Sequence, residues 1–246
     1  MQGGIGSEFM QKTRYAYLGP SDQQQGVRPP PVVKTRAEGE SGIALPPPEA
    51  LGLDPLDFAA LVTQRASLRR FVATPLSMTE LSFLLWSTQG VKAQGETHTL
   101  RTTPSAGARH AFETVLLVNL VDGLAPGLYG YAPLNHRLVN RNAPADIGDR
   151  IAAACHGQRF VKDCAVTFFW VAVPYRMTWR YVERGYRYLH LDAGHVCQNL
   201  YLAAEATGCG ACAVAAFDDD ALNGLLNLDG EEAFVIYLAA MGKRPA

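Results

Sequence analysis

The sequence predicts an α+β fold, in which helices flank a central sheet. Strand-like apolar runs and helix-like runs are interspersed along the chain, but they do not alternate strictly as strand, helix, strand. Strict alternation is typical of doubly wound parallel sheets, so its absence favours an α+β arrangement with mixed or antiparallel pairing. The 246 residues, of which 48% are hydrophobic and 18% charged, suffice for one core and are too few for two comfortable domains.

Five stretches have the β-branched and aromatic composition of strands. The run at 165–173 is so apolar that we expect a strand buried on both faces. The stretch at 127–139 is expected to form a hairpin that turns near Leu134 and Asn135. The other expected strands lie at 114–121, 211–216 and 234–241.

Capping residues mark where the helices are expected to begin. Asp54 followed by Pro55 predicts a first helix, with the proline at its first position. Ser77 and Glu80 form a capping-box pattern, which predicts a second helix that ends near Gly90. Further helices are expected at 147–154 and, as a long buried helix, at 190–206. Asp220 is expected to cap a short helix that runs through Leu226.

Composition divides the chain into three parts. Residues 1–9 are Gly-rich and precede a second methionine, Met10, so we expect them to be left from an expression tag. Residues 10–50 are rich in proline, glutamine, glycine and charge without a sustained hydrophobic period, which predicts an extended N-terminal arm. Residues 51–246 contain the strand and helix signals and form the predicted folded domain.

Charge and cysteine content narrow the expected partners and location. A net charge of -1 gives no overall positive field for nucleic acid or an anionic membrane surface, so neither is an expected partner. No run approaches the roughly 20 apolar residues of a membrane-spanning helix. The five cysteines are an odd number, which argues against a secreted disulfide framework and favours a cytoplasmic protein.

One short segment after the first predicted helix has the composition of a phosphate site. If the chain is extended there, Arg65, Ser67 and Arg69 project to one side, because side chains alternate along a strand. Two guanidinium groups and a hydroxyl would then face the same ligand, and the planar donors of arginine match phosphate oxygens bidentately. The alternative is a solvated basic loop.

This segment is the first of an ordered set of motifs. The set is R-x-S-x-R-x-F at 65–71, P-S-A-G-A-R-H at 104–110, P-G-L-Y-x-Y at 126–131, H-x-L at 136–138, R-Y-x-x-R-G-Y-R-Y at 180–188, D-A-G-H-x-x-Q-N at 192–199, F-D at 217–218 and L-D-G at 228–230. Each motif is weak alone, but the order is specific. The succession, over most of the chain, resembles the SagB-type dehydrogenases, the thiazole- and oxazole-forming (McbC-like) branch of the FMN-dependent nitroreductase family.

The resemblance implies a nitroreductase-like fold and an interlocked homodimer with FMN bound at two sites between the subunits. The FMN phosphate would be held by Arg65, Ser67 and Arg69. Lys243 and Arg244 follow the last predicted strand, where relatives commonly place further basic partners of the phosphate.

Two further segments are implied to contact the flavin ring. Small residues allow a backbone to approach an aromatic ring closely, and the loop that packs against the flavin from the other subunit corresponds to Pro104, Ser105 and Gly107. A backbone N–H near flavin N5 or O4 would orient the ring. This role is implied for Gly208, Cys209 and Gly210. Alternatively, these residues end the preceding helix as its C-cap, and the same residues can serve both roles.

The implied activity is hydride transfer between flavin N5 and a small heterocyclic or peptide-borne substrate, as in azoline dehydrogenation. Relatives present a Lys-Tyr catalytic pair where this chain has Arg180 and Tyr181. A guanidinium stays protonated in proteins and is a poor base, so Arg180 would instead stabilise an anion or anchor a substrate carboxylate. Tyr181 would donate or relay a proton.

Two other functions fit the same residues. One is a nitroreductase of broad specificity that uses NAD(P)H, although no G-x-G-x-x-G after a strand indicates a dedicated dinucleotide domain. The other is a flavin-binding scaffold in a biosynthetic complex, with a cyclodehydratase as its partner. A C-x-x-C pattern joins Cys209 to Cys212, but the second such pair of a structural zinc site is missing, so no metal site is expected.

Overall fold

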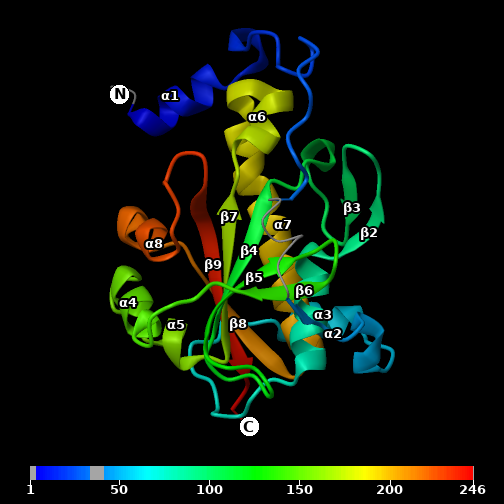
Figure 1. Ribbon diagram of the computed structural model, residues 1–246, viewed down its shortest axis with the longest axis vertical. Coiled ribbons are helices and arrows are strands. Elements are labelled where there is room, and N and C mark those ends of the chain that lie inside the picture. Colours follow the sequence, from blue (N-terminus) through cyan, green and yellow to red (C-terminus); the bar gives the residue numbers. More distant parts are fainter. Residues whose placement is uncertain (1–3, 34–41, 246) are drawn as a thin grey trace.

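The computed structural model describes residues 4–33 and 42–245, and a seven-stranded sheet forms its centre (Figure 1). The strand order is β1-β6-β5-β4-β7-β9-β8, and neighbouring strands pair antiparallel. The strands are β1 (Ile43–Ala44), β4 (Phe112–Val118), β5 (Gly127–Ala132), β6 (Arg137–Asn140), β7 (Val166–Ala172), β8 (Cys209–Val214) and β9 (Phe234–Lys243). A separate hairpin joins β2 (Val91–Gln94) to β3 (Thr99–Arg101). The predicted α+β fold is confirmed, with antiparallel pairing throughout this sheet.

Helices cover both faces of the sheet, as Figure 1 shows. On one face lie α3 (Met78–Gln89) and the long α7 (Gly185–Ala206). Two shorter helices, α2 (Phe58–Gln64) and α6 (Tyr175–Tyr181), contact α7. On the other face lie α4 (Ile147–Ala154), α5 (Phe160–Asp163) and α8 (Asp219–Leu225).

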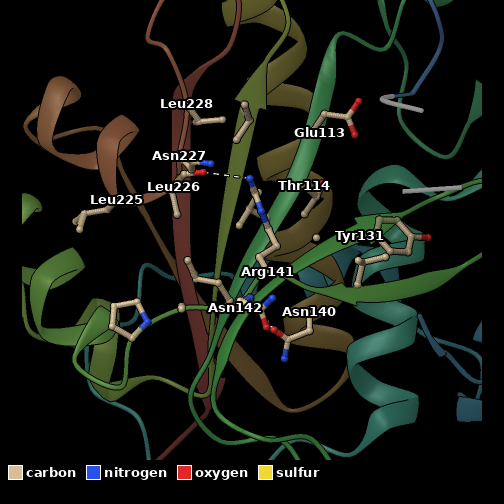
Figure 2. Close-up of a pocket in the computed structure, with 17 residues that line it drawn as sticks. Glu113, Thr114, Tyr131, Asn140, Arg141, Asn142, Leu225, Leu226, Asn227 and Leu228 are labelled. Atoms are coloured by element: carbon tan, nitrogen blue, oxygen red, sulfur yellow. Dashed lines mark hydrogen bonds between the residues drawn. The ribbon is translucent and has the colours of Figure 1, made fainter. Parts of the chain in front are cut away.

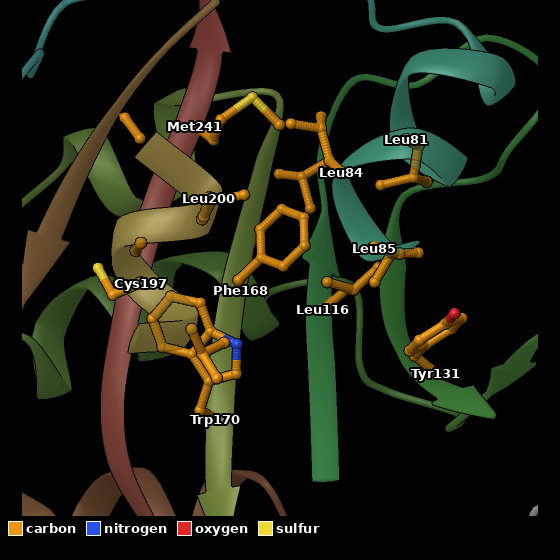
Figure 3. Packing of buried hydrophobic residues seen from close by; sticks show 14 of the residues in the cluster. Leu81, Leu84, Leu85, Leu116, Tyr131, Phe168, Trp170, Cys197, Leu200 and Met241 are labelled. Atoms are coloured by element: carbon orange, nitrogen blue, oxygen red, sulfur yellow. The ribbon is translucent and has the colours of Figure 1, made fainter. Parts of the chain in front are cut away.

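Each face of the sheet has its own hydrophobic cluster. Side chains alternate along a strand, so Phe168 and Trp170 of β7 pack toward α3 and α7, whereas Phe169 packs toward α4 and α8. Figure 3 shows Phe168 between Leu84 of α3 and Leu200 of α7. All seven residues of β7 are buried, which explains its continuous apolar sequence and confirms the predicted two-sided burial.

The predicted capping box is confirmed, and the first predicted cap was wrong. The Ser77 hydroxyl accepts a hydrogen bond from the Glu80 amide (3.2 Å), and the Glu80 carboxylate accepts one from the Ser77 amide (2.9 Å). Asp57, not Asp54, caps α2, because the Asp57 carboxylate accepts a hydrogen bond from the Ala59 amide at 2.8 Å. Both aspartates precede the same apolar run, so composition alone did not distinguish them.

The helices of the C-terminal half differ from the prediction mainly at their ends. Asp218, not Asp220, caps α8, with its carboxylate 2.9 Å from the Ala221 amide. The long helix α7 begins at Gly185, five residues before its predicted start. The sequence did not predict α6, because its aromatic residues have no strong helix propensity and tertiary contacts decide their conformation.

The described N-terminal residues run beside α6 and the first turn of α7 (Figure 1). They contain α1 (Ile5–Lys12), which crosses the predicted boundary between tag and arm, and a short 3₁₀ turn at Tyr15–Tyr17. Residues 1–3 of the predicted tag, 34–41 of the predicted arm and 246 of the predicted domain lie outside the described residues. Within residues 4–33 and 42–245, no helix is long and apolar enough to span a bilayer.

Candidate functional site

The segment that contains the R-x-S-x-R motif lies along the outer edge of β8. Ser67 forms a parallel bridge with Ala211, and the Leu68 amide donates to the Ala211 carbonyl at 2.8 Å. A Cβ atom on Gly210 would lie 2.6 Å from Leu68 Cδ2 and 2.9 Å from Leu68 Cβ, so glycine is required for this close approach. The segment therefore follows the sheet edge, with Ser67 and Arg69 exposed and Arg65 half-buried.

Tyr201 of α7 connects this segment to β8, a role that the sequence did not predict. Its hydroxyl accepts a hydrogen bond from the Ala213 amide (2.8 Å) and lies 3.0 Å from the Ser67 hydroxyl. The Arg65 guanidinium lies over the Tyr201 ring, 5.3 Å from its centroid. Arg69 is exposed and makes no hydrogen bond or ion pair with the described residues. In the sequence, the only sign of this contact was a tyrosine among the apolar residues of the predicted long helix.

Lys243 and Arg244 are already paired with acidic side chains. The Lys243 ammonium bonds to the carboxylate of Glu80, and the Arg244 guanidinium bonds to Glu205, whose side chain is 3% exposed. Burial would raise the pKa of Glu80, but the hydrogen bond and charge of Lys243, together with the hydrogen bonds from Ser77, outweigh burial and lower it. Each basic residue thus balances an acid of this chain, and the remaining positive charge of the predicted phosphate site comes from Arg65 and Arg69.

Gly208 and Cys209 connect α7 to β8 directly beside Lys243. Gly208 has φ +64°, and its amide donates to the Glu205 carbonyl (3.2 Å), so it closes the helix as the C-cap interpretation predicted. Cys209 pairs with Lys243 across β8 and β9, and its thiol is buried. We call the following residues the sheet-edge cluster: Arg65, Ser67, Arg69, Gly208, Cys209, Gly210, Lys243 and Arg244.

The loop at 104–107 lies against the predicted catalytic pair. Gly107 has φ +58°, and a Cβ atom there would lie 2.5 Å from the Tyr181 hydroxyl oxygen and 3.0 Å from Arg180 Nε. Glycine is therefore needed both for the backbone conformation and for space. The structure brings the loop predicted to face the flavin into direct contact with Arg180 and Tyr181.

Asp192 of α7 anchors this loop. Its carboxylate oxygens each lie 3.3 Å from the Ala106 amide that donates to them, and it also bonds to Ser105. The Ser105 hydroxyl accepts a hydrogen bond from the His110 amide at 2.9 Å. Burial raises the pKa of Asp192, and the hydrogen bonds from Ser105 and Ala106 oppose this shift. Pro104, at the start of the loop, is exposed.

Arg109 and Arg180 both lie near the Gly107 loop, Arg109 buried and Arg180 exposed. The Arg109 Nε–H donates to the Gly107 carbonyl (3.2 Å), and its guanidinium lies 5.1 Å from the centroid of the Trp179 ring. Burial lowers the pKa of Arg109, and the charge of Arg180 lowers it further. Because Arg109 is buried, the charge available to an anionic or electron-rich group is that of the exposed Arg180. We call Pro104, Ser105, Gly107, Arg109, Arg180 and Tyr181 the loop cluster.

The two clusters have separate anchors on α7. They are connected to α7 at Tyr201 and at Asp192, which are nine residues apart and therefore about 13 Å apart along the helix. Separate positions agree with the resemblance, which implies that the phosphate residues and the loop at 104–107 contact one FMN from different subunits. Asp192 belonged to a quoted motif but had no predicted role, although an acid in an apolar helix is an unusual feature.

A third region is concave but belongs to neither cluster. Figure 2 shows this pocket, of about 680 Å³, between β5, β6 and the end of α8. Arg141 lies in it and donates to the Leu226 carbonyl at 3.1 Å. Within the described ranges, no group of three or more His, Cys, Asp or Glu side chains is placed to hold a metal ion.

Comparisons with known proteins match the part of the chain that contains these clusters. The Nitroreductase family model matches residues 62–243. A protein of Methanocaldococcus jannaschii with a provisional nitroreductase name is 32% identical over 185 residues, which are 75% of this chain and 89% of that protein.

Solved structures show the same fold. A provisionally named nitroreductase of Ralstonia eutropha is 26% identical with a TM-score of 0.69, and the match covers 89% of this chain and 95% of that one. One from Anabaena variabilis is 29% identical with a TM-score of 0.64 over 76% of this chain, which spans only 38% of that chain's length. A chain of the Escherichia coli microcin synthetase McbBCD complex is 18% identical, with a TM-score of 0.62. This match covers 98% of our chain and 92% of the microcin synthetase chain.

The family match bears directly on three predictions. It confirms the nitroreductase-like fold, the enzyme class of oxidoreductase and FMN as the cofactor. The interlocked dimer and the roles of individual residues stay predictions. Because the family model covers most of the chain, including every residue of both clusters except Arg244, the chain belongs to the nitroreductase family.

Proposed function

We propose that this chain is an FMN-dependent oxidoreductase of the SagB-like branch, which transfers hydride between flavin N5 and a small heterocyclic or peptide-borne substrate. The observation that carries this proposal is the contact of Gly107 with Arg180 and Tyr181. It makes one continuous surface from the loop predicted to face the flavin and the residues predicted to face the substrate. The ordered motifs at 65–71, 104–110 and 180–188 support the same branch.

The residues of the chain fit the cofactor. Ser67 and Arg69 are exposed beside β8, and Arg65 is held next to them over the Tyr201 ring. Together they offer a hydroxyl and two permanently charged forks to a phosphate group. Gly107 lets Arg180 and Tyr181 pack directly against the loop backbone, because a Cβ atom at this position would collide with the Tyr181 hydroxyl. Bound FMN would supply the two-electron acceptor, with hydride received at N5.

Arg180 and Tyr181 take complementary parts in the proposed reaction. When a substrate C–H bond breaks, its electron pair leaves as hydride and a neighbouring group must take up a proton. Arg180 keeps its charge, so it stabilises negative charge or binds a substrate carboxylate. Tyr181 relays the proton through its hydroxyl, which lies at the Gly107 backbone, to solvent water.

The separation of the two clusters favours a homodimer with one FMN site at each end of the shared interface. The sheet-edge cluster of one subunit would face the loop cluster of the other. An exposed face of α7 supports this arrangement, since Leu191 is 60% exposed there. Light scattering during size-exclusion chromatography measures the molar mass of the protein and tests this dimer. A monomeric mass for FMN-loaded protein would contradict a site shared between subunits.

FMN binding provides the direct test of the proposed function. We expect the purified protein to be yellow, and Arg65→Ala and Arg69→Ala each to weaken FMN binding about tenfold or more, because each removes a charge-assisted hydrogen bond. Arg70→Ala is the matched control, since Arg70 is exposed beside Arg69 but outside the alternating pattern. Colourless protein that ignores added FMN, or equal losses in all three variants, would refute the proposed phosphate site.

Arg180 also supports a second candidate. Because it is a poor base, the chain is also compatible with a broad-specificity NAD(P)H-dependent nitroreductase, or with a flavin-binding scaffold beside a cyclodehydratase in the cytoplasm. The fold shared with a chain of the microcin synthetase complex fits the scaffold. Arg180→Lys separates these functions: it should raise azoline oxidation if the SagB-like chemistry is right, whereas an unchanged or lower rate favours the alternatives.

A further inference from the structure

The N-terminal residues bind the first turn of α7 through a compact group of side chains. The Tyr15 hydroxyl lies 2.8 Å from the Tyr188 hydroxyl. Arg184 lies between the two rings, 4.4 Å from the Tyr15 centroid, and its Nε–H donates to the Tyr188 hydroxyl at 2.9 Å. The Arg184 NH1 group also donates to the Thr13 carbonyl at 3.1 Å. Residues more than 170 positions apart thus form one hydrogen-bonded unit.

A second attachment holds α6 immediately before the catalytic pair. The Gln23 amide donates to the Trp179 carbonyl at 3.0 Å, and the Trp179 indole N–H donates to the Val27 carbonyl at 2.9 Å. Trp179 is buried, and it directly precedes Arg180. The N-terminal segment therefore fixes both the backbone and the side chain at this position. Figure 1 shows the segment beside α6.

Tyr188 transmits these contacts to Tyr181. The two rings meet edge to face, with centroids 4.8 Å apart and an interplanar angle of 75°. Such aromatic pairs have a preferred geometry, so the position of one ring restricts the other. On its opposite side, the Tyr181 hydroxyl meets the Gly107 backbone. The Gly107 loop thus positions the hydroxyl on one side. The N-terminal segment, acting through Tyr188, positions it on the other side.

We propose that Tyr15 is a positioning residue for this site: its hydroxyl bond to Tyr188 fixes the Tyr181 ring against the Gly107 loop. This inference rests on the proposed role of Tyr181. Tyr15 itself is 65% exposed and touches neither Arg180 nor Gly107 among the contacts of the described residues. Its hydroxyl reaches the site through Tyr188, so loss of the hydroxyl should alter the reaction rate without altering cofactor binding.

The test compares Tyr15→Phe with Tyr17→Phe in the full chain. Tyr15→Phe removes one hydroxyl and keeps the ring against Arg184, and Tyr17 is an exposed neighbour whose hydroxyl makes no hydrogen bond within the described residues. The bound FMN is reduced chemically, and its reoxidation by a nitroaromatic acceptor is followed at increasing acceptor concentration. We expect the limiting rate constant to fall about fivefold in Tyr15→Phe, the value of about one hydrogen bond, with FMN content and half-saturating concentration unchanged.

A readout that does not depend on the flavin accompanies the kinetics. Hydrogen–deuterium exchange of amides 179–188 should accelerate in Tyr15→Phe and stay at the parent rate in Tyr17→Phe, because the aromatic contact that orders this segment is weakened. Adding Tyr15→Phe to Tyr188→Phe should change nothing further, since both remove the same bond.

The outcomes separate this inference from the proposed function. If the parent binds FMN and reduces the acceptor, but Tyr15→Phe behaves as Tyr17→Phe in rate and exchange, the positioning role is wrong and the proposed function stands. If the parent binds no FMN, the proposed function and the positioning role are both wrong. Equal loss of FMN content and rate in Tyr15→Phe would mean a general structural role and would also overturn the inference.

Discussion

The sheet-edge cluster and the loop cluster are held by different kinds of contact. The sheet-edge cluster is built on β8 and β9, whose strand pairing sets Cys209 opposite Lys243 and Gly210 opposite Gly242. The loop cluster lies on a turn and the end of α6, and it depends on side-chain bonds from Asp192 and from the N-terminal segment. Ladder hydrogen bonds leave a backbone little freedom, whereas a turn held by a few side chains opens more easily.

This difference predicts which measurement each cluster affects. Changes at the sheet edge should first reduce the free energy of unfolding, because they disturb the packing of an edge strand. Changes at the loop should first reduce the rate of the reaction, because the loop and Tyr181 can shift while the core stays folded. Variants at matched positions in the two clusters test this distinction.

Gly210→Val should have the largest effect on stability. The new side chain would overlap Leu68, because a Cβ atom at position 210 would already lie within 2.9 Å of Leu68 Cδ2 and Cβ. Overpacking at a tight contact costs about 3 kcal/mol at the upper end of its usual range. Urea unfolding measures the loss, and FMN binding should fall with it.

The matched control is Gly224→Ala on α8, where a Cβ atom would meet nothing within 4 Å. Alanine has the higher helix propensity, so this variant should be neutral or slightly more stable. A loss in Gly210→Val no larger than in the control would show that Leu68 moves aside without cost and that the sheet edge is not tightly packed.

Lys243→Met should lower the free energy of unfolding by about 2 kcal/mol, because it leaves the largely buried Glu80 carboxylate without its cation. Thermal or urea unfolding measures this change. Lys162→Met serves as the control, because its partner Asp149 is 68% exposed and exposed ion pairs contribute little to stability. Similar losses in both variants would contradict the special position of the Glu80 pair.

The contribution of the Glu80 pair should depend on pH in a definite direction. The pKa of Glu80 in the folded chain lies below its ordinary value of 4.5, so the unfolded chain takes up this proton first as the pH falls. The stabilisation is therefore complete above pH 4.5 and is lost as the pH falls through the lowered pKa. The stability difference between the parent and Lys243→Met should narrow over that interval. A difference that widens there would contradict the ion pair.

Gly107→Ala should have the smallest effect on stability and a clear effect on rate. A left-handed φ costs an alanine about 1 kcal/mol, and its Cβ atom would displace the Tyr181 hydroxyl. We expect unfolding to change by about that amount and the rate of flavin reoxidation to fall about tenfold or more. If stability falls strongly while the rate per bound FMN is unchanged, the distinction between the clusters is wrong.

Much of the fold was predictable because its strands carry local signals. The two-sided burial of β7 makes an uninterrupted apolar run, and the capping box at Ser77 and Glu80 is a pattern within four residues. The exact caps of α2 and α8 were not predictable, because neighbouring aspartates compete for the same role and only the packed backbone selects one. The helix α6 was missed, since contacts distant in sequence hold it.

For the site, the sequence by itself determined the chemical groups: the arginines and serine of the motif at 65–71, the small residues of the loop at 104–107, and the Arg180–Tyr181 pair. Their order also indicated the family. Only the tertiary structure decided that Tyr201 and Asp192 anchor two separate clusters, that Lys243 and Arg244 are paired with acids, and that an N-terminal tyrosine meets Tyr188. Local patterns report propensities and periodicity, but contacts between residues far apart in the chain arise from packing, which no local pattern contains.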